Sequence, residues 1–385
     1  MRILLEYSPQ ATQVASSVLY THIKKFSSNG QITKPHEFYW EITSNCNLRC
    51  QHCFVSDAKA LLINKDLSTK KCISIIDQLK CLGVYLIIFS GGEPFLRNDF
   101  LDIVEYTKNN NISVVIHTNS LLITDETISK LNSLLHPKMD ILQISLDGAT
   151  KKTHETIRGR HTFDKTIDNI KTISQTNIKL RVNFTPTKFN VIELPDTFSL
   201  CSSMDVAYFG FSDFLELRES YNFGPDENVL LKAIAETIHR SLNSFSEFSY
   251  QLDTKILYQR YTNVTNNYNA SLKEKIQNHK SVRCSSSFRS MALRSDGRVF
   301  LCIPASYCDS DMLCLGDVKR ESLSDIWSYR LNNILYVGRD AEKLSCYKNK
   351  CEFFEKCRGG CVAKAYYYSG DINAPDPRCK IAKTF

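Results

Sequence analysis

The sequence predicts an α/β protein in which a partial (β/α)6 barrel is followed by a small cysteine-rich domain. From about residue 38 the chain alternates short β-rich runs with helical patterns, and three of these runs begin 28 residues apart, at positions 84, 112 and 140. That interval is about the length of one βα unit. The cysteines provide the second observation, because nine of the fifteen lie between residues 284 and 379.

Six short runs are predicted strands, because they are rich in apolar, β-branched and aromatic residues. Their apolar stretches are continuous rather than alternating, which favours parallel strands covered on both faces. Six such βα units would close partway into a TIM-like barrel. The runs are EFYWEIT (37–43), VYLIIF (84–89), ISVVIH (112–117), DILQISL (140–146), KLRVNF (179–184) and VAYFGF (206–211).

The first predicted helix lies between the first two strands and shows an apolar stripe at helical spacing. Gly83 is placed to end this helix. Asn98 or Asp99 is expected to cap the next helix, and Thr124 or Asp125 the one after it. The stripe of the first helix consists of Cys72, Ile75, Ile76, Leu79 and Leu82.

The whole chain is expected to contain four segments. The last of them includes MALRSDGRVFLC (291–302), which alternates like a hairpin with Asp296 and Gly297 at its turn. Because barrel enzymes place their chemistry at the carboxyl ends of strands, functional motifs are expected immediately after strands. The segments are an N-terminal extension (1–37), the barrel (38–211), a mainly helical bridge (212–283) and the cysteine-rich domain (284–385).

Composition narrows the possible functions. The net charge of +7 comes from 48 Lys and Arg against 41 Asp and Glu, scattered without a nucleic-acid-binding motif, so we expect no nucleic-acid partner. No apolar run could span a bilayer, and Glu6 interrupts any signal peptide, so we expect a cytoplasmic protein without a membrane partner. Thiols stay reduced there, which favours metal ligation over disulfides. Cys72, Cys81 and Cys201 stand in apolar contexts and are expected to be buried.

The first predicted strand is followed at once by CNLRCQHCF, in which Cys46, Cys50 and Cys53 form a C-x3-C-x2-C arrangement. Structural zinc usually takes four protein ligands. A [4Fe–4S] cluster can be held by three thiolates, which leaves one iron for a non-protein ligand. The spacing therefore favours a cluster, with zinc as the alternative.

The second predicted strand is followed by SGGEP (90–94). Gly91 and Gly92 allow a backbone to approach a ligand closely, and Glu93 offers a carboxylate to an ammonium group. Taken alone, the glycines have an ordinary alternative as a turn.

Polar residues also follow the third and fourth predicted strands. Asn119 follows the third, Ser145 and Asp147 lie at the end of the fourth, and Arg158 then supplies a fork suited to a carboxylate. Each could instead be a turn or surface residue. Together, at successive strand ends, they indicate a pocket for a zwitterionic amino acid joined to a nucleoside.

CNLRCQHCF, SGGEP and ISLDG with a downstream IRG resemble the core of the radical S-adenosylmethionine (SAM) superfamily over about residues 38–211. The resemblance implies a cluster on the three cysteines, with the amino and carboxylate groups of SAM on the open iron. It also implies that Gly91, Gly92, Glu93 and Pro94 contact the amino group of SAM and that Arg158 contacts its carboxylate. Ser145 and Asn119 would lie near the ribose, and Phe54 would lie near the adenine.

The cysteine-rich segment is spaced C-x12-G-x4-C, then C-x4-C-x5-C-x3-C and a final Cys. On the residues alone, two structural zinc ions are the alternative to clusters. The spacing and LGDVKRESLSDIW (315–327) resemble the SPASM domain, the auxiliary-cluster extension of radical SAM enzymes. The family pattern usually has C-x2-C where this chain has Cys346-x4-Cys351.

This second resemblance implies two auxiliary [4Fe–4S] clusters. The first would use Cys284, Cys302 and Cys361, and we assign Cys308 as its fourth ligand, with Cys314 or a position open to substrate as alternatives. The second cluster would be held by Cys346, Cys351, Cys357 and Cys379.

The resemblance implies an enzyme that reductively cleaves SAM to a 5′-deoxyadenosyl radical, which abstracts a hydrogen from the substrate. Auxiliary clusters offer a route for a further electron, so we expect a net oxidation. SPASM proteins commonly cross-link or oxidise ribosomally made precursor peptides, and we expect such a substrate. An external electron donor such as flavodoxin or ferredoxin is the other expected partner.

Other functions remain open. One is radical oxidation or decarboxylation of a small molecule or tetrapyrrole precursor. Formylglycine-type sulfatase maturation is disfavoured, because Ile303 follows Cys302 where that class has an Asp. A non-catalytic cluster or zinc protein is disfavoured by SGGEP and Arg158, which such a protein does not need. Residues 1–45 are too few for a complete leader-binding domain, so a separate partner or residues 212–283 would have to serve.

Overall fold

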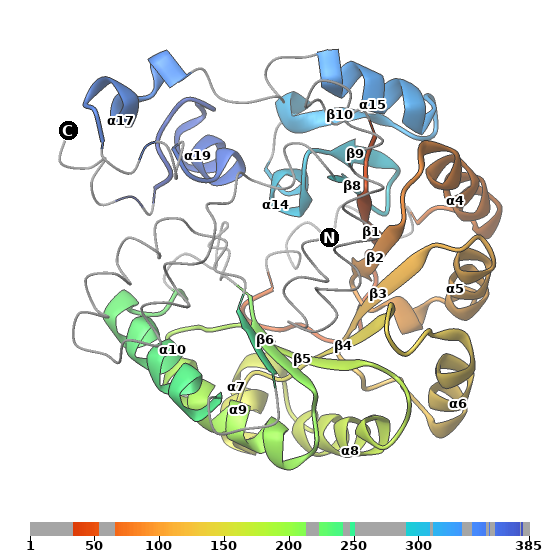
Figure 1. The fold of residues 1–385 in the computed structure, drawn as a ribbon, viewed down its shortest axis with the longest axis vertical. Coiled ribbons are helices and arrows are strands. Elements are labelled where there is room, and N and C mark those ends of the chain that lie inside the picture. Colours follow the sequence, from red (N-terminus) through yellow and green to blue (C-terminus); the bar gives the residue numbers. More distant parts are fainter. Residues whose placement is uncertain are drawn as a thin grey trace. The chain divides into compact units, whose positions relative to one another are not determined.

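The computed structural model describes two compact units of the chain (Figure 1). The first contains the described residues up to position 250 together with 294–296, and the second contains those at 290–293 and from 297 onward. The described residues are 34–53, 66–212, 223–241, 247–250, 290–308, 311–332, 341–351, 354, 359–377 and 379.

The described part of the first unit contains seven parallel strands that follow one another in chain order, each paired with the next. The first six confirm the predicted partial barrel, with strand ends shifted by at most two residues. The seventh lies in the segment expected to be mainly helical. The strands are β1 (Glu37–Thr43), β2 (Leu86–Gly91), β3 (Ser113–Thr118), β4 (Ile141–Ser145), β5 (Leu180–Phe184), β6 (Tyr208–Phe211) and β7 (Glu247–Tyr250).

Helices cover the outer face of this sheet (Figure 1). Two 3₁₀ turns, η1 (Pro94–Leu96) and η2 (Val191–Glu193), interrupt the connections that follow β2 and β5. The helices are α4 (Thr69–Leu82), α5 (Phe100–Asn109), α6 (Asp125–Leu134), α7 (Lys151–Arg158), α8 (Phe163–Ser174), α9 (Leu194–Ser203) and α10 (Glu227–Ser241).

Local sequence signals set the helix ends. α4 ends at Gly83, whose φ of 80° is a left-handed conformation that suits glycine. Asp99 and Thr124 occupy the N-cap positions of α5 and α6, and the Thr124 side chain accepts a hydrogen bond from the main-chain N–H of Thr127. The predicted caps are therefore confirmed for these three helices.

The isolated cysteines were expected to be buried, and one is not. Cys72 and Cys201 are buried, but Cys81 is exposed. Helical periodicity explains the difference, because the buried positions of α4 end with Leu79, and Cys81 lies two residues further around the helix.

The two faces of the sheet differ in polarity. The helix-covered face is apolar and fully buried, and each large side chain there stabilises the fold by about 1.5–3 kcal/mol. On the opposite face, an apolar cluster formed by Leu86, Ile88, Val115 and Ile141 lies toward the amino ends of the strands. Two residues beyond Val115 and Ile141 on the same strands, the side chains are His117 and Gln143. Polar side chains therefore take the place of the apolar cluster toward the carboxyl ends. The sheet therefore becomes polar where the predicted motifs lie.

The second unit contains short antiparallel strands and short helices. β8 and β9 form the predicted hairpin, with Gly297 at a φ of 94° in the turn, and β10 pairs with β9. The elements are β8 (Ser290–Leu293), β9 (Arg298–Phe300), α14 (Ile303–Ser306), η5 (Asp311–Leu313), β10 (Cys314–Asp317), α15 (Leu323–Asn332), η6 (Ala341–Lys343), α17 (Ser345–Lys348) and α19 (Val362–Ser369).

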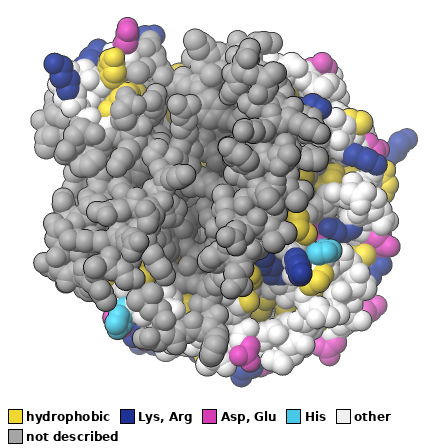
Figure 2. Space-filling model, in the orientation of Figure 1, with side chains coloured by type: hydrophobic (Ala, Val, Ile, Leu, Met, Phe, Trp, Pro, Cys, Tyr) yellow, Lys and Arg dark blue, Asp and Glu magenta, His cyan; other side chains and the backbone are white. Residues whose placement is uncertain are grey.

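The described surface shows mixed charge. Basic and acidic side chains are interspersed over the described part of the face in Figure 2. Within the described ranges, no helix is both long and apolar enough to cross a membrane.

Candidate active site at the carboxyl ends of the strands

The three cysteines of the first motif lie in the loop that follows β1, which we call the cluster loop (residues 44–53). The main-chain N–H of Leu48 donates to Sγ of Cys46 at 3.4 Å, and the N–H of Cys53 donates to the carbonyl of Cys50 at 3.1 Å. These two hydrogen bonds fix the turn of the loop that carries the three cysteines.

The glycines of SGGEP lie against the start of the cluster loop. The N–H of Gly92 donates to the carbonyl of Thr43, and the N–H of Glu93 to the carbonyl of Asn45, both at 2.7 Å. A Cβ on Gly92 would lie 1.8 Å from the carbonyl oxygen of Asn45, and one on Gly91 would lie 2.3 Å from that of Thr43. These glycines therefore allow close approach to the chain's own loop.

The Glu93 carboxylate, expected to face an ammonium group, is engaged at the end of β3. It accepts hydrogen bonds from the hydroxyl of Thr118 (2.7 Å), the N–H of Asn119 (2.8 Å) and the N–H of Phe95 (3.3 Å). Burial raises the pKa of Glu93 to about 7, against the opposing effect of these bonds. Glu93 therefore ties the end of β2 to that of β3.

Asn119 continues this connection back to the cluster loop. Its side-chain Nδ2 donates to Oδ1 of Asn47 at 2.8 Å, and its Oδ1 accepts from the N–H of Leu121 at 3.0 Å. Both ends of the amide are thus used within the protein. Its predicted place near the ribose stays a prediction, as does that of Ser145, a partly exposed residue opposite Asn183 of β5.

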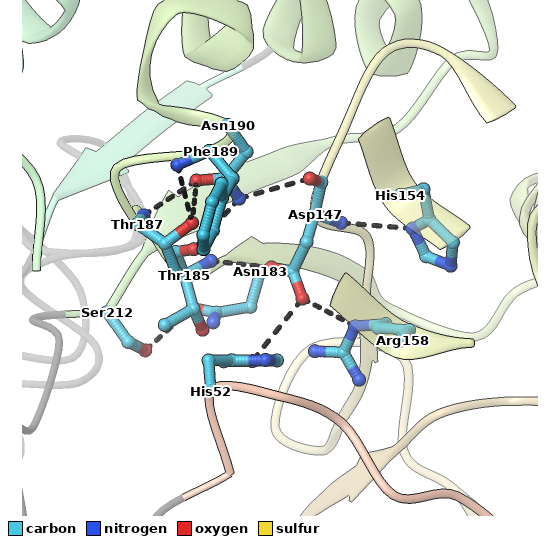
Figure 3. Close-up of polar contacts among 10 residues, drawn as sticks. All are labelled: His52, Asp147, His154, Arg158, Asn183, Thr185, Thr187, Phe189, Asn190 and Ser212. Atoms are coloured by element: carbon cyan, nitrogen blue, oxygen red, sulfur yellow. Dashed lines mark hydrogen bonds and ion pairs between the residues drawn. The ribbon is translucent and has the colours of Figure 1, made fainter. Parts of the chain in front are cut away.

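Asp147 is the centre of a second network, shown in Figure 3. Its Oδ2 accepts from Nε of Arg158 at 2.5 Å and lies 3.4 Å from Nε2 of His52. Its Oδ1 accepts from the N–H of Thr185 at 2.7 Å, and its own N–H donates to Nδ1 of His154 at 3.2 Å. One fully buried residue therefore contacts the cluster loop, α7 and the residue after β5.

The charges in this network are fixed near neutral pH. Burial disfavours both charged groups, but the attraction between them prevails, so the pKa of Asp147 is lowered and that of Arg158 is raised. Burial lowers the pKa of His52 to about 4, although Asp147 opposes this. His52 is therefore neutral, and its Nε2 is placed to donate to the carboxylate.

The network leaves both a hydrogen-bond acceptor and donors unused by the described residues. Nδ1 of His52 is buried and has no hydrogen-bond partner among them. The two terminal nitrogens of Arg158 make no hydrogen bond within the described part of the chain (Figure 3). A zwitterionic amino acid supplies N–H donors and a carboxylate, so these residues fit the amino-acid end of SAM. Phe54, predicted near the adenine, lies outside the described residues.

In the cluster loop, Cys50 lies within electrostatic range of both Cys46 and Cys53. Burial raises the pKa of Cys50 to about 11, and Cys53 and Cys46 add to this, whereas Arg158 opposes it. Within the described ranges, no three Cys, His, Asp or Glu side chains gather tightly enough for a single metal ion. A [4Fe–4S] cluster needs a wider arrangement, because each thiolate binds a different iron.

The second unit brings together three of the four cysteines predicted for the second auxiliary cluster. Burial raises the pKa of the Cys346 thiol, and the nearby Cys351 and Cys379 raise it further. The N–H of Cys351 donates to the carbonyl of Cys346 at 2.9 Å. Cys357, the fourth, lies outside the described residues.

The cysteines predicted for the first auxiliary cluster lie around α14 and α19. Cys302 and Cys361 are the N-cap residues of these helices. Sγ of Cys308 lies 3.6 Å from the carbonyl of Ala363, which places this thiol beside the start of α19. Sγ of the alternative, Cys314, contacts the carbonyl of Gly316 at 3.5 Å. Cys284 lies outside the described residues.

Sequence reasoning missed several residues that build this site. His52 and Asn47 fall inside the cysteine motif, and Asn190 donates to the carbonyls of Asp147 and Thr185, both at 3.0 Å. The only available signal was position, because these residues lie in the motif or soon after a predicted strand. Their partners are up to 95 residues away in the sequence, as for His52 and Asp147 (147 − 52).

Two family models match the chain. The radical SAM superfamily matches residues 40–199, and SPASM, an iron–sulfur cluster-binding domain, matches residues 284–361. These segments contain the two cysteine constellations described above, apart from Cys379.

Characterised relatives match along most of the chain. An AdoMet-dependent heme synthase of Methanosarcina barkeri is 28% identical, over 90% of this chain and 96% of its own length. The mycofactocin maturase MftC of Mycolicibacterium smegmatis is 26% identical, over 88% of this chain and 81% of its own.

The fold matches that of Streptococcus suis SuiB, with a TM-score of 0.72, 19% identity and coverage of 97% of this chain and 84% of SuiB. SuiB has also been solved with its precursor peptide SuiA.

Proposed function

Because the chain is a radical SAM enzyme with a C-terminal SPASM domain, we propose that it carries out a net oxidative modification of a ribosomally made precursor peptide. The observation that carries the SAM chemistry is the arrangement around the cluster loop. Two of its thiols, those of Cys50 and Cys53, lie beside a buried Asp147–Arg158 pair whose guanidinium has two terminal nitrogens to offer a carboxylate.

The residues of the first unit have distinct tasks in this proposal. Cys46, Cys50 and Cys53 hold the cluster, and Arg158 receives the carboxylate of SAM. Glu93 holds the strand ends in place and would also face the ammonium group of SAM. When bound, the cluster and SAM supply a 5′-deoxyadenosyl radical that takes a hydrogen atom from the substrate.

The residues of the second unit serve the oxidation. Cys351 and Cys379 both lie within electrostatic range of Cys346, and together with Cys357 these residues would hold an auxiliary cluster. Cys308 and Cys361, which both lie beside the start of α19, would belong to the other cluster together with Cys302 and Cys284. Clusters at these positions would accept the second electron, so that an external acceptor completes a two-electron oxidation. The proposal therefore requires three [4Fe–4S] clusters.

Two comparisons support a peptide substrate. The relative MftC is named a mycofactocin maturase, and SuiB, which has this fold, was solved with a precursor peptide. A tetrapyrrole precursor is the second candidate, because the heme synthase relative is 28% identical and matches over 96% of its length.

Anaerobic turnover decides between the candidates. The reconstituted enzyme, with SAM and a reductant, is incubated either with precursor peptides encoded beside its gene or with an iron tetrapyrrole that carries propionates. We expect a peptide to accelerate 5′-deoxyadenosine formation and to lose two hydrogens, as measured by mass spectrometry. Loss of carbon dioxide from the tetrapyrrole, with every peptide unchanged, would establish the second candidate instead.

A further inference from the structure

Asp147 joins parts of the candidate site that lie far apart in the sequence. The side chain is fully buried, and its Oδ2 accepts from Nε of Arg158 on α7. The same oxygen lies 3.4 Å from Nε2 of His52 in the cluster loop, and Oδ1 accepts from the N–H of Thr185 after β5 (Figure 3). The loop that carries the cysteines and the helix that carries the arginine are therefore fixed to one carboxylate.

α7 is attached to Asp147 at two points on one helical face. His154 accepts from the main-chain N–H of Asp147 through Nδ1, and Arg158 follows four residues later, about one turn along the helix. The carboxylate occupies Nε of the guanidinium. The two terminal nitrogens make no hydrogen bond within the described residues and are left to receive a ligand carboxylate (Figure 3).

The place of Asp147 in the site needs a physical explanation, because it adds a buried negative charge near the cysteines. Three thiolates would already gather negative charge in this region, and a further buried carboxylate beside them stays charged because of its ion pair with Arg158. Arg158 alone could compensate the thiolates. An arginine without a partner on Nε would, however, be free to adopt other rotamers.

We infer that Asp147 is a positioning residue that orients Arg158 toward the carboxylate of SAM and, through His52, fixes the cluster loop relative to that arginine. The inference rests on the proposed function. It predicts that loss of Asp147 weakens the binding of ligands that carry the carboxylate received by Arg158, and not of ligands that lack it.

The test measures the affinity of two ligands for the cluster-loaded, unreduced holoenzyme by equilibrium dialysis. The first ligand is SAM, and the second is decarboxylated SAM, which keeps the adenosine, sulfonium and amine but lacks the carboxylate. For Asp147→Asn, which preserves side-chain volume, we expect SAM to bind about tenfold more weakly. Decarboxylated SAM should bind with its affinity unchanged within about twofold.

Asp140→Asn is the matched control. Asp140 is equally buried, immediately before β4, and pairs with Lys108 at 2.6 Å. It also accepts main-chain hydrogen bonds from Val114 (2.7 Å) and His136 (2.6 Å). The control therefore removes a buried negative charge with similar contacts but none to the cluster loop, and it should leave both affinities unchanged.

The outcomes separate the inference from the proposed function. If Asp147→Asn weakens both ligands alike, or neither, Asp147 only stabilises the fold and the inference is wrong. If that variant loses iron, Asp147→Glu is measured instead, because it keeps the charge and displaces the carboxylate by one methylene; the same selective loss is expected, and its absence contradicts the inference. If the wild-type holoenzyme does not bind SAM at all, the proposed function itself fails.

Discussion

The two ends of β4 each carry a fully buried aspartate, and the two are used differently. Asp140, at the amino end, pairs with Lys108 of α5 and accepts main-chain hydrogen bonds from Val114 and His136. Asp147, at the carboxyl end, pairs with Arg158 and also contacts the cluster loop through His52.

The difference lies in what the partners do. The partners of Asp140 among the described residues all belong to the neighbouring βα units, so the residue stabilises their packing. Asp147 instead gathers segments that each carry a candidate functional group. The same residue type at the same depth therefore serves stability at one end of the strand and positioning at the other, as expected for a barrel whose chemistry lies at the carboxyl ends.

The largest effect is expected at the glycines on either side of β2. Gly92→Ala should remove the iron of the SAM cluster and reduce 5′-deoxyadenosine formation more than about 100-fold, because its Cβ would overlap the carbonyl of Asn45 in the cluster loop. Gly83→Ala, at the amino end, meets only Lys34 at 3.7 Å and should cost about 1–2 kcal/mol of stability through its positive φ. Iron analysis and product chromatography measure the contrast, and full activity in Gly92→Ala would contradict it.

The cations paired with the two aspartates come next. Arg158→Lys keeps the charge but loses the fork, so the dissociation constant of SAM should rise about tenfold. Lys108→Arg at the other end should leave that constant unchanged, since Lys108 contacts Asp140 and the carbonyl of Ile112. Equilibrium dialysis gives both values. Equal SAM affinity in wild type and Arg158→Lys would show that Arg158 does not bind the carboxylate of SAM.

A substitution of Asp140, at the amino end of β4, should lower the stability of the protein even though it leaves SAM binding unchanged. Asp140→Asn leaves Lys108 without its carboxylate and weakens two main-chain hydrogen bonds, so the free energy of unfolding should fall by about 1–3 kcal/mol. Denaturant unfolding monitored by circular dichroism measures the change. A loss smaller than that of an exposed control, Asp164→Asn, would show that Asp140 is not a stabilising residue.

The smallest effect is a pH dependence at Glu93. Its pKa in the folded protein, about 7, lies above its ordinary value of 4.5, so the folded state binds the proton more tightly than the unfolded chain does. The stability linked to this proton is fully present below pH 4.5 and is lost as the pH rises through 7. Because glutamine resembles the protonated acid, the stability difference between wild type and Glu93→Gln should change in favour of the variant between pH 6 and pH 8. A constant difference would contradict the raised pKa.

Periodicity made most of the first unit predictable. The strands from β1 to β6 are continuous apolar runs, and the caps at Gly83, Asp99 and Thr124 are local signals, so both can be identified from neighbouring residues alone. β7 was missed because four residues, EFSY, carry too little pattern to distinguish a strand in a polar region. Pairing with β6 supplies the information that the short sequence lacks.

The site was predictable in its residues but not in their contacts. The motifs identified Glu93, Asn119 and Asp147, because they follow strands. Their hydrogen bonds depend on side chains that meet only after the sheet forms, and in the described structure Glu93 and Asn119 hold other parts of the protein rather than an open pocket. No spacing rule links His52 to a residue on another strand.

We expect the thiols of the cluster loop to hold the cluster on which SAM is cleaved. The most direct measurement is 5′-deoxyadenosine formation from SAM and dithionite by a variant in which Cys46, Cys50 and Cys53 are all replaced by Ala, with bound iron counted in the same sample. We predict that cleavage is abolished while the iron of the auxiliary clusters is retained. Cleavage that persists at the wild-type rate would show that these thiols do not hold the cluster that cleaves SAM.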